Sequence, residues 1–413
     1  MGETGKRARA LQERVIRTRH KVVNGAIKAL ATHGVTNLTH RAVARAAGVS
    51  LAATTYHYAT KQDILAETSR ILMDGYLDAF RRLETRLVAG QEAGLHTLED
   101  LVMRVVGNAL GRDRKGSLAW CELILHGGRN AEGRALAQRW YTRLDEIWLG
   151  ISDRLPSRTG LRASAAIDLA VGLTILLHPL ELDAKTALAL LDGRAHLDQQ
   201  PMTREIAAED TAPDDPSGKD QGRHAATRER LVEAGIEILL RGGAASVSYT
   251  SVAERTGMVR SGPSYYFPTI DGLLKAAQIA LFSRAKARYR AGIGSVAPEK
   301  IDKTRLADLT TAIFFHELLQ FPHENLGYCS VWMNSVQNAA LRPTVFGSLL
   351  DLNHAWMRRL RAATEGSVHA AAPLWLQGLF MGKLIRGIAA QPDTGDLSRS
   401  REDFAAIIQA MTK

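Results

Sequence analysis

Cysteine is scarce in this chain of 413 residues, which contains only Cys121 and Cys329. So few thiols exclude a disulfide framework and any zinc site built from several cysteines, and they are compatible with a reducing compartment. Each cysteine follows an aromatic residue, Trp120 or Tyr328. We expect both thiols to be small buried core groups, with a reactive thiol as the alternative.

Long apolar runs are also lacking. The most apolar stretch, residues 167–180, contains Asp168 and stops at Pro179, well short of the ~20 residues that a membrane span needs. The basic N-terminus has no apolar segment typical of a signal peptide. We therefore expect a buried core helix at 167–180, no membrane association and a cytoplasmic location.

Catalytic and cofactor motifs are missing as well. The sequence has no G-x-G-x-x-G, no phosphate-binding P-loop and no G-x-S-x-G, so we expect neither an enzyme nor a bound cofactor. His126 and the pair His316-Glu317 lack the spacing of metal ligands. We expect these three residues to be structural and predict no metal site.

Positive charge exceeds negative charge, with 53 Lys and Arg against 43 Asp and Glu, and the pI is about 9.7. This balance suggests a polyanionic partner, although a basic composition alone is weak evidence. A hydrophobic content of 46% indicates a globular chain, and the length suits two to four domains.

An internal repeat is the most informative feature. Shifting the chain by 209 residues aligns positions 18–65 with 227–274 without a gap, and 12 of these positions are identical, among them Gly34/Gly243, Gly48/Gly257 and Tyr56/Tyr265. A shift of 208 then aligns Cys121 with Cys329 and Trp148 with Trp356. Between the copies, residues 197–222 contain three prolines and seven acidic residues, which is typical of a linker.

The start of each copy follows a helix-turn-helix pattern. Val22, Val23, Ala26, Ile27 and Leu30 form the apolar stripe of one helix, and Gly34 lies past its end. Thr39 is an N-cap for a second short helix, which Gly48 ends, and Ser50 is an N-cap for a third. In the second copy, the cap is Ser248 or Thr250, Gly257 marks the turn, and the reading helix is expected from about Arg260 to Phe267.

The segment LTHRAVARAAGVSLAATTYHYATKQDIL, residues 38–65, resembles the DNA-binding domain of TetR-family transcriptional regulators. SYTSVAERTGMVRSGPSYYFPTIDGLL, residues 248–274, is similar but matches less well. The resemblance implies an all-α chain of two fused TetR-like units, each with a helix-turn-helix domain and a helical bundle that binds a ligand and dimerises. The expected domains are 1–65 and 223–274 for DNA binding, 66–196 and 275–413 for the bundles, and 197–222 for the linker.

The resemblance also implies DNA-binding residues in the first copy. The short reading helix enters the major groove, and its lack of positive charge is no obstacle, since hydroxyls and methyl groups read base edges. Phosphate contacts are expected from Arg41, from Lys61 and from seven basic residues before position 22, whose alternative role is that of a solvated tail. The implied contact residues are Thr39, Arg41, Ser50, Leu51, Ala53, Thr54, Tyr56, His57 and Lys61, and the seven basic residues are Lys6, Arg7, Arg9, Arg14, Arg17, Arg19 and Lys21.

The second copy differs at key positions. Thr250 and Ile270 replace Arg41 and Lys61, while Arg260 is able to make a bidentate contact with guanine. We therefore expect two unlike half-sites; the alternative is a degenerate second copy that serves only the fold. Its implied contact residues are Thr250, Arg260, Ser261, Ser264, Tyr265, Tyr266 and Thr269.

The bundle segments carry fewer signals. Gly378 and Gly382, at i and i+4, would let a partner helix approach closely, as in a dimerisation bundle formed within one chain. Candidate pocket residues, for each of which core packing is the alternative, are Trp120, Cys121, Trp140, Trp148, Phe314, Phe315, Tyr328, Trp332, Met333 and Trp356.

Together these features predict a ligand-responsive regulator, most simply a repressor, that binds a double-stranded DNA operator as an intrachain pseudo-dimer. The expected effector is a largely apolar small molecule, and association of two chains stays open. In the alternative, only the first helix-turn-helix reads DNA, and the second half serves the fold, ligand binding or protein contacts.

Overall fold

The computed structural model describes residues 3–35, 37–92, 94–157, 159–202, 221–293, 301–392 and 394–412. These residues form an all-α fold, as predicted, and the single β-bridge in them joins Val368 to Thr412. Most of the predicted linker, residues 203–220, lies outside the described residues.

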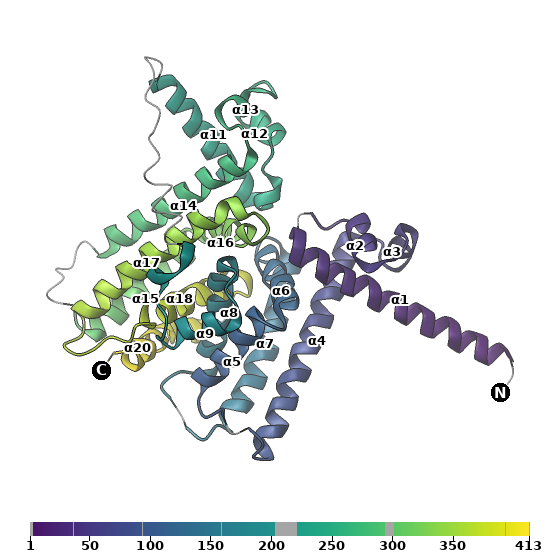
Figure 1. Cartoon of the computed structure of the whole chain (residues 1–413), viewed down its shortest axis with the longest axis horizontal. Coiled ribbons are helices and arrows are strands. Elements are labelled where there is room, and N and C mark those ends of the chain that lie inside the picture. The colour runs from purple at the N-terminus through teal and green to yellow at the C-terminus, as the bar shows by residue number, and fades with distance from the viewer. Residues whose placement is uncertain are drawn as a thin grey trace.

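The order of helices in residues 3–202 recurs in residues 221–412 (Figure 1). The first half contains α1 (Glu3–His33), α2 (His40–Ala47), α3 (Leu51–His57), α4 (Lys61–Val88), α5 (Leu98–Leu110), α6 (Arg114–Gly127), α7 (Ala131–Ser152), α8 (Ala163–Leu177), η1 (His178–Leu180), α9 (Ala184–Leu191) and η2 (Leu197–Gln199). The second half contains α11 (Gln221–Gly242), η3 (Ala244–Ser246), α12 (Tyr249–Thr256), α13 (Gly262–Tyr266), α14 (Ile270–Ile293), α15 (Lys303–Gln320), α16 (Pro322–Gln337), η5 (Ala339–Leu341), α17 (Arg342–Ala362), α18 (Ala372–Ala389), α19 (Thr394–Ser398) and α20 (Ser400–Ala410).

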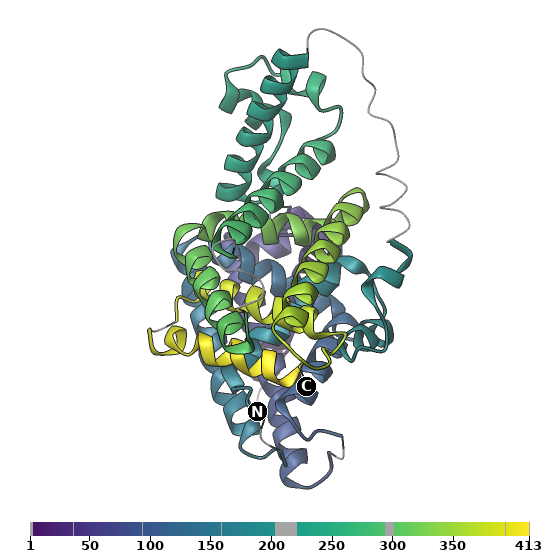
Figure 2. The same ribbon diagram turned by 90° about the vertical axis from the view of Figure 1, so that its left-hand side faces the viewer.

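Two small helical heads project from a common helical body. We call α1–α3 the first head and α11–α13 the second head; α4–α9 and α14–α20 form the body. In Figure 1 the first head lies on the right and the second head at the top, and in Figure 2 the second head again stands clear of the body. The start of α1 extends away from the rest of the molecule (Figure 1).

The first helix is longer than its apolar stripe predicts. It begins at Glu3 and therefore includes the basic N-terminal segment, which extends the helix instead of forming a separate tail. Val22, Val23, Ala26 and Leu30 are buried and Ile27 is half-buried, as the periodicity predicts. Gly34 ends the helix with φ 70°, a left-handed conformation that glycine adopts at little cost.

The centre of the body is the crossing of α8 with α18, which joins the two halves (Figure 1). A Cβ atom on Gly172 would lie 1.8 Å from the carbonyl oxygen of Gly378, and one on Gly382 would lie 1.7 Å from that of Asp168. Only glycine permits such close helix backbones, so the close approach predicted from Gly378 and Gly382 is present.

Helix α8 accounts for the apolar run in the sequence. Within the described residues, Ala163–Leu180 is the one helical segment long and apolar enough to cross a membrane, and 94% of it is buried inside the fold. It is thus a core helix, as we expected, in contact with α18, α5 and α7.

Candidate nucleic-acid interface

In the first head, α2 and α3 each begin at a side-chain cap. The Thr39 side chain accepts a hydrogen bond from the Ala42 amide at 3.1 Å, and the Ser50 side chain accepts one from the Ala53 amide at 3.1 Å. Gly48 makes the intervening turn with φ 64°. These contacts satisfy amides that a helix start leaves unpaired, and they fix α3 across α2.

The outward face of α3 carries an unusually exposed tyrosine. Tyr56 is 82% exposed and Leu51 is 44% exposed, and Ala52 and Thr55 are exposed beside them. Ala53 and His57, two further predicted contact residues within this helix, are half-buried. The face is therefore short, apolar and hydroxyl-bearing, with no charge on it.

The prediction that Thr54 contacts DNA is wrong. The Thr54 side chain is fully buried, and its hydroxyl donates a hydrogen bond to the Leu51 carbonyl at 2.7 Å, so it cannot face a groove. Thr55, which we did not predict, takes the outward place together with Ala52. The helical period could have shown this, because Leu51, Ala52, Thr55 and Tyr56 share one face while Thr54 points to the core.

Basic groups flank this face instead of lying on it. Arg41, on α2, is exposed, whereas Lys61, at the start of α4, is half-buried, and burial lowers the pKa of its amine. Of the seven N-terminal basic residues, Arg14, Arg17, Arg19 and Lys21 are exposed on α1. The side chains of Lys6, Arg7 and Arg9 lie outside the described residues.

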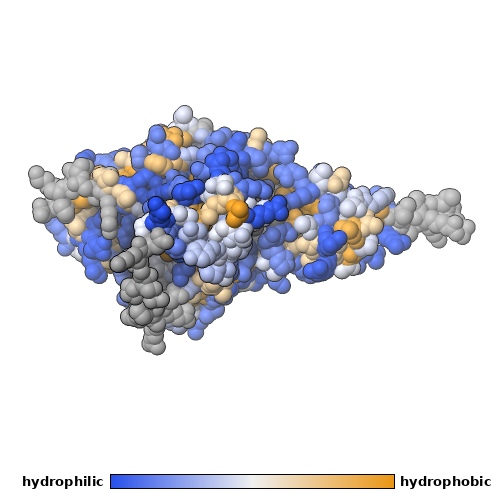
Figure 3. All heavy atoms as spheres, turned by 90° about the horizontal axis from the view of Figure 1, so that it is seen from above, coloured by the Kyte–Doolittle hydropathy of each residue, from blue (hydrophilic) through white to orange (hydrophobic). Residues whose placement is uncertain are grey.

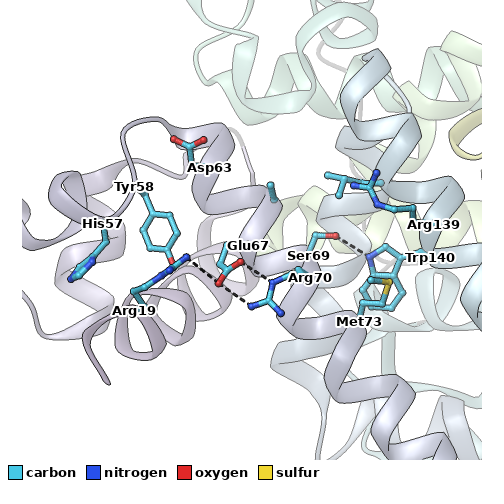
Figure 4. Close-up of a pocket in the computed structure, with 12 residues that line it drawn as sticks. Arg19, His57, Tyr58, Asp63, Glu67, Ser69, Arg70, Met73, Arg139 and Trp140 are labelled. Atoms are coloured by element: carbon cyan, nitrogen blue, oxygen red, sulfur yellow. Dashed lines mark hydrogen bonds and ion pairs between the residues drawn. The ribbon is translucent and has the colours of Figure 1, made fainter. Parts of the chain in front are cut away.

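A polar cleft of about 470 Å³ separates the end of α3 from α7 (Figure 4). His57 and Tyr58 line it on one side and Arg139 and Trp140 on the other. Within it the Arg19 guanidinium lies 5.7 Å from the centre of the Tyr58 ring and 3.5 Å from the Glu67 carboxylate. Arg19 thus ties the first head to α4 and is less available to a phosphate.

Glu67 also holds Arg70 at 2.9 Å, and this pairing lowers the pKa of the carboxyl (Figure 4). The ion pairs at this junction are partly exposed and contribute little stability individually. Of these two ion pairs, only the Arg19–Glu67 pair joins the first head to α4, since Glu67 and Arg70 both lie on α4.

The second head repeats the plan with a shorter reading helix. Ser248 is the cap of α12, and Gly257 makes the turn with φ 69°. We predicted a reading helix from Arg260 to Phe267, but α13 spans only Gly262–Tyr266. Its start lacks a side-chain cap, and Pro263, with no amide to donate, is buried in the first turn.

The exposed residues of the second head differ in character from those of the first. Tyr265 is 76% exposed, Val259 is 74% exposed, and Arg260 and Ser261 are exposed beside them. Thr250 is also exposed, and Ser264 and Tyr266 are half-buried. Thr269 is exposed and accepts a hydrogen bond from the Gly272 amide at 3.1 Å, which caps α14. Val259 was not predicted, because it lies in the turn before the helix.

A view onto the side that bears the second head shows a mainly hydrophilic surface with small, separate hydrophobic patches (Figure 3). Beneath Tyr265, the Arg228 guanidinium lies 4.2 Å from the centre of the Phe267 ring and donates to the Tyr266 carbonyl at 2.9 Å. Arg19 and Tyr58 make the equivalent contact in the first head. Both tyrosines are therefore presented by the same kind of arginine–aromatic support.

The two heads meet the body at α6 and α16. The Glu122 carboxylate, on α6, accepts a hydrogen bond from the Val35 amide at 3.0 Å and one from the Gln337 side chain, on α16, at 3.3 Å. Arg129 donates to the Ser330 hydroxyl at 2.5 Å across the same junction. Burial raises the pKa of Glu122, while these donors oppose that rise.

The predicted pocket residues fall into two groups. Tyr328 and Trp356 line a cavity of about 230 Å³ in the second half. Trp120, Cys121, Trp148, Phe314, Trp332 and Met333 are buried, Phe315 packs against them half-buried, and Trp140 is buried at the edge of the cleft in Figure 4. The residues of this second group belong to the packed core, and Trp140 also lines the cleft.

The remaining polar candidates differ in burial and in partners. Glu317 is fully buried and accepts two hydrogen bonds from Arg288 at 2.7 Å each. Cys121 and Cys329 are buried as expected, and burial raises the pKa of the Cys329 thiol to about 12. His126 is half-buried, and burial lowers its pKa to about 4.

A family model matches most of the first head and the start of α4. Residues 22–68 match the model of "Bacterial regulatory proteins, tetR family". No curated protein matches the chain.

Two solved structures share low similarity with it. The multidrug binding protein EbrR, in complex with imidazole, is 19% identical with a TM-score of 0.37, and the match covers 47% of this chain and 96% of EbrR. A putative TetR-family transcriptional regulator from Rhodococcus sp. is 18% identical with a TM-score of 0.36, and the match covers 46% of this chain and 100% of that one. The family model identifies residues 22–68 as a tetR-type N-terminal domain, which supports a DNA-binding transcriptional regulator.

Proposed function

We propose that the chain is a ligand-responsive transcriptional repressor that binds its operator with both heads at once. The observation that carries this proposal is the exposed, uncharged face of α3 around Tyr56, within a domain that matches the tetR family model. A repressor acts where the DNA is, so the proposal includes a cytoplasmic location.

The chemistry of α3 suits direct reading of bases. The Thr55 hydroxyl is a donor and acceptor, and the apolar groups of Leu51 and Ala52 fit the methyl group of thymine. Affinity then comes from the flanking cations, chiefly Arg41, Lys61 and, on α1, Arg14 and Arg17, which neutralise phosphates.

The second head presents a different surface to DNA. Arg260 is exposed in the turn before α13, and an arginine there can pair with the O6 and N7 atoms of guanine. Tyr265 takes the place of Tyr56. We infer that the two half-sites differ in sequence and lie about one helical turn, ~34 Å, apart.

The buried charges between α8 and α18 support pairing within one chain. Asp168, on α8, accepts a hydrogen bond from Arg386, on α18, at 2.6 Å, and Lys383, also on α18, lies 3.7 Å from the same carboxylate and 2.6 Å from that of Asp403, on α20. All four of these side chains are buried, so each would be costly without its partner.

These charges are not symmetric. Asp168 lies four residues before Gly172, and the residue four before Gly378 is Leu374. Two first halves would therefore bring two Asp168 carboxylates together, and two second halves would leave Arg386 without the Asp168 carboxylate. The pairing of a first half with a second half is the one in which the charges neutralise each other, and one chain supplies both.

A narrower alternative keeps DNA reading in the first head alone. The shorter α13 and the match of the family model to residues 22–68 favour it. Under this alternative the second half contributes the fold and ligand binding.

The test is a mobility-shift titration of the full chain on DNA upstream of its own gene and neighbouring genes. We expect a sequence-specific shift that weakens at higher salt, and at least tenfold weaker binding for Tyr56→Ala and for Tyr265→Ala. Loss with Tyr56→Ala alone would favour the narrower alternative. Absence of any specific shift would overturn the regulator.

A further inference from the structure

A cavity of about 230 Å³ lies in the second half, between α14, α16, α17 and α18. Its walls are aromatic and apolar, and include Phe282, Tyr328, Trp356 and Phe380. The Phe282 and Tyr328 rings are stacked, with centroids 6.4 Å apart and planes 23° apart. Leu176, from α8 of the first half, closes one side. Such a space suits a flat apolar molecule.

The first half fills the equivalent space with its own side chains. By the alignment of the two copies, Tyr76 occupies the position of Ala285, which lines the cavity, and Trp140 occupies that of Ser348, which does not line it. The Tyr76 and Trp140 rings contact each other at 5.9 Å, and Trp140 donates to the Ser69 hydroxyl at 2.9 Å. The hollow that remains beside Tyr76 is a surface groove. The Tyr76 side chain, packed against Trp140, thus distinguishes the first half from the second half, where Ala285 leaves a cavity.

One polar group in the wall has no use in the fold. Gln377 lines the cavity and is only 6% exposed, yet neither its amide oxygen nor its amide nitrogen has a hydrogen-bond partner among the described residues. An unpaired buried amide costs free energy. The equivalent residue of α8, one before Gly172, is Val171, so an apolar side chain is compatible with this helix packing. The amide of Gln377 is therefore suited to a bound hydroxyl or amide group.

The mouth of the cavity is cationic. Lys286, Arg358 and Arg359 line it against a single acid, Asp351, which pairs with Lys286 at 2.6 Å. Arg358 is exposed, and the Arg359 guanidinium lies 5.8 Å from the centre of the Trp356 ring. A ligand whose outer end is negative would be attracted here, and a positive one repelled.

We propose that this cavity binds one small aromatic carboxylate per chain, with its ring between Phe282, Tyr328 and Trp356, a ring hydroxyl at Gln377 and its carboxylate at the arginines. The size agrees, since a cavity of ~150 Å³ accepts benzene and this one has room for a few more atoms. The inference rests on the proposed function insofar as this ligand is the effector.

The position of the cavity connects it to both heads. Helix α16 lines it with Asn325, Tyr328 and Cys329, and the same helix contacts α11 of the second head. Further along α16, Gln337 donates to Glu122, which also holds the Val35 amide of the first head. A shift of α16 on binding would therefore reach both heads.

The test is isothermal titration of the full chain, without DNA, using 4-hydroxybenzoate, benzoate and benzylamine. We expect saturable binding of one 4-hydroxybenzoate per chain, weaker binding of benzoate, and none of benzylamine. Two ligands per chain, no binding of either carboxylate, or equal binding of benzylamine would overturn the proposal.

Matched variants locate the site. Ala285→Tyr introduces the side chain that fills the first half and should weaken binding at least tenfold, while Tyr76→Phe, the control in the first half, should leave it unchanged. Gln377→Leu should weaken 4-hydroxybenzoate about tenfold but leave benzoate unchanged, and unchanged thermal unfolding would show that it folds. Equal loss of both ligands in Gln377→Leu, or no effect of Ala285→Tyr, would contradict the assignment.

The DNA experiment is independent of this one. Ligand binding that does not alter the mobility shift would leave the cavity assignment standing and remove ligand response from the proposed function. A protein that shifts the operator but binds neither carboxylate would overturn the cavity assignment and leave DNA binding standing.

Discussion

At the residue scale, the two neighbouring threonines of α3 have opposite environments. Both hydroxyls donate to backbone carbonyls of the preceding turn, but Thr54 is fully buried while Thr55 is exposed next to Tyr56. A difference of one position in a short helix separates a core side chain from a candidate base contact. The same pair of residue types thus gives an internal control for DNA reading.

We predict that Thr55→Ala weakens operator binding about tenfold, since a lost base contact costs ~1–3 kcal/mol. Its unfolding free energy should change by no more than about 0.5 kcal/mol, because the site is exposed. Thr54→Val, which keeps the shape of the buried side chain, should leave operator affinity unchanged. Mobility-shift titration and denaturant unfolding measure both; equal DNA affinities for the two variants would contradict this orientation of α3.

A buried histidine predicts how stability depends on pH. His178 is fully buried with its Nε2 atom 2.9 Å from the Ser117 hydroxyl, and burial lowers its pKa to about 3. Between pH ~6.5 and about 3 the unfolded chain binds the proton more readily than the folded chain. Stability contributed by the neutral ring is therefore present above pH ~6.5 and is lost as pH falls, at up to ~1.4 kcal/mol per pH unit.

We expect His178→Gln to flatten the fall in unfolding free energy between pH 6.5 and 4, measured by denaturant titration at several pH values. His196→Gln, at an exposed histidine, is the control and should keep the original slope. The same slope in both variants would mean that other groups dominate acid sensitivity.

At the element scale, close helix contact depends on where glycine stands. Gly382 and Gly172 lie where α8 and α18 cross, whereas a methyl group added to Gly75, on α4, would meet no neighbouring element within 4 Å. Glycine at 172 and 382 lets the two halves pack closely, whereas glycine at 75 only lowers the stability of α4. The crossing is therefore the element contact on which the body depends.

We predict that Gly382→Ala lowers the unfolding free energy by about 1–3 kcal/mol, because its Cβ would meet the Asp168 carbonyl and force the helices apart. Gly75→Ala should instead raise it by about 0.5–1 kcal/mol, since glycine is unfavourable inside a helix. Denaturant unfolding of the two variants measures the difference, and a destabilised Gly75→Ala would contradict this explanation.

The elements could largely be predicted from sequence, because caps and apolar period are local signals. Thr39, Gly48 and Ser50 take the predicted positions, and Val22 to Leu30 form the expected stripe. The length of α13 could not be predicted, since it depends on the uncapped start at Ser261 and on the packing of Pro263. The cavity could not be predicted from the sequence, because Gln377 and Phe282 come together only through tertiary packing.

At the scale of the whole molecule, opposite buried charges join the halves. Asp168 and Asp145 hold Arg386, and although burial lowers its pKa, the two carboxylates outweigh that effect and raise it. Arg162 makes two hydrogen bonds of 2.7 Å to Asp403 across the same boundary. This arrangement favours a first half paired with a second half.

We predict that Asp168→Leu lowers the unfolding free energy by up to about 3–5 kcal/mol, because the buried Arg386 then keeps only the partly exposed Asp145 as its carboxylate partner. Adding Arg386→Leu should recover most of this loss, since the equivalent position of the first half, Leu180, already carries leucine in a buried place. A double-mutant cycle by denaturant unfolding measures the coupling. Additive losses would show that Asp168 and Arg386 do not act as a pair.

The proposed function requires that one chain reads one operator by itself. Footprinting of the operator, combined with the mass of the protein–DNA complex, tests this directly. We expect one chain bound to two half-sites of unlike sequence, about one helical turn apart. Two chains bound to a palindrome of identical half-sites would contradict it.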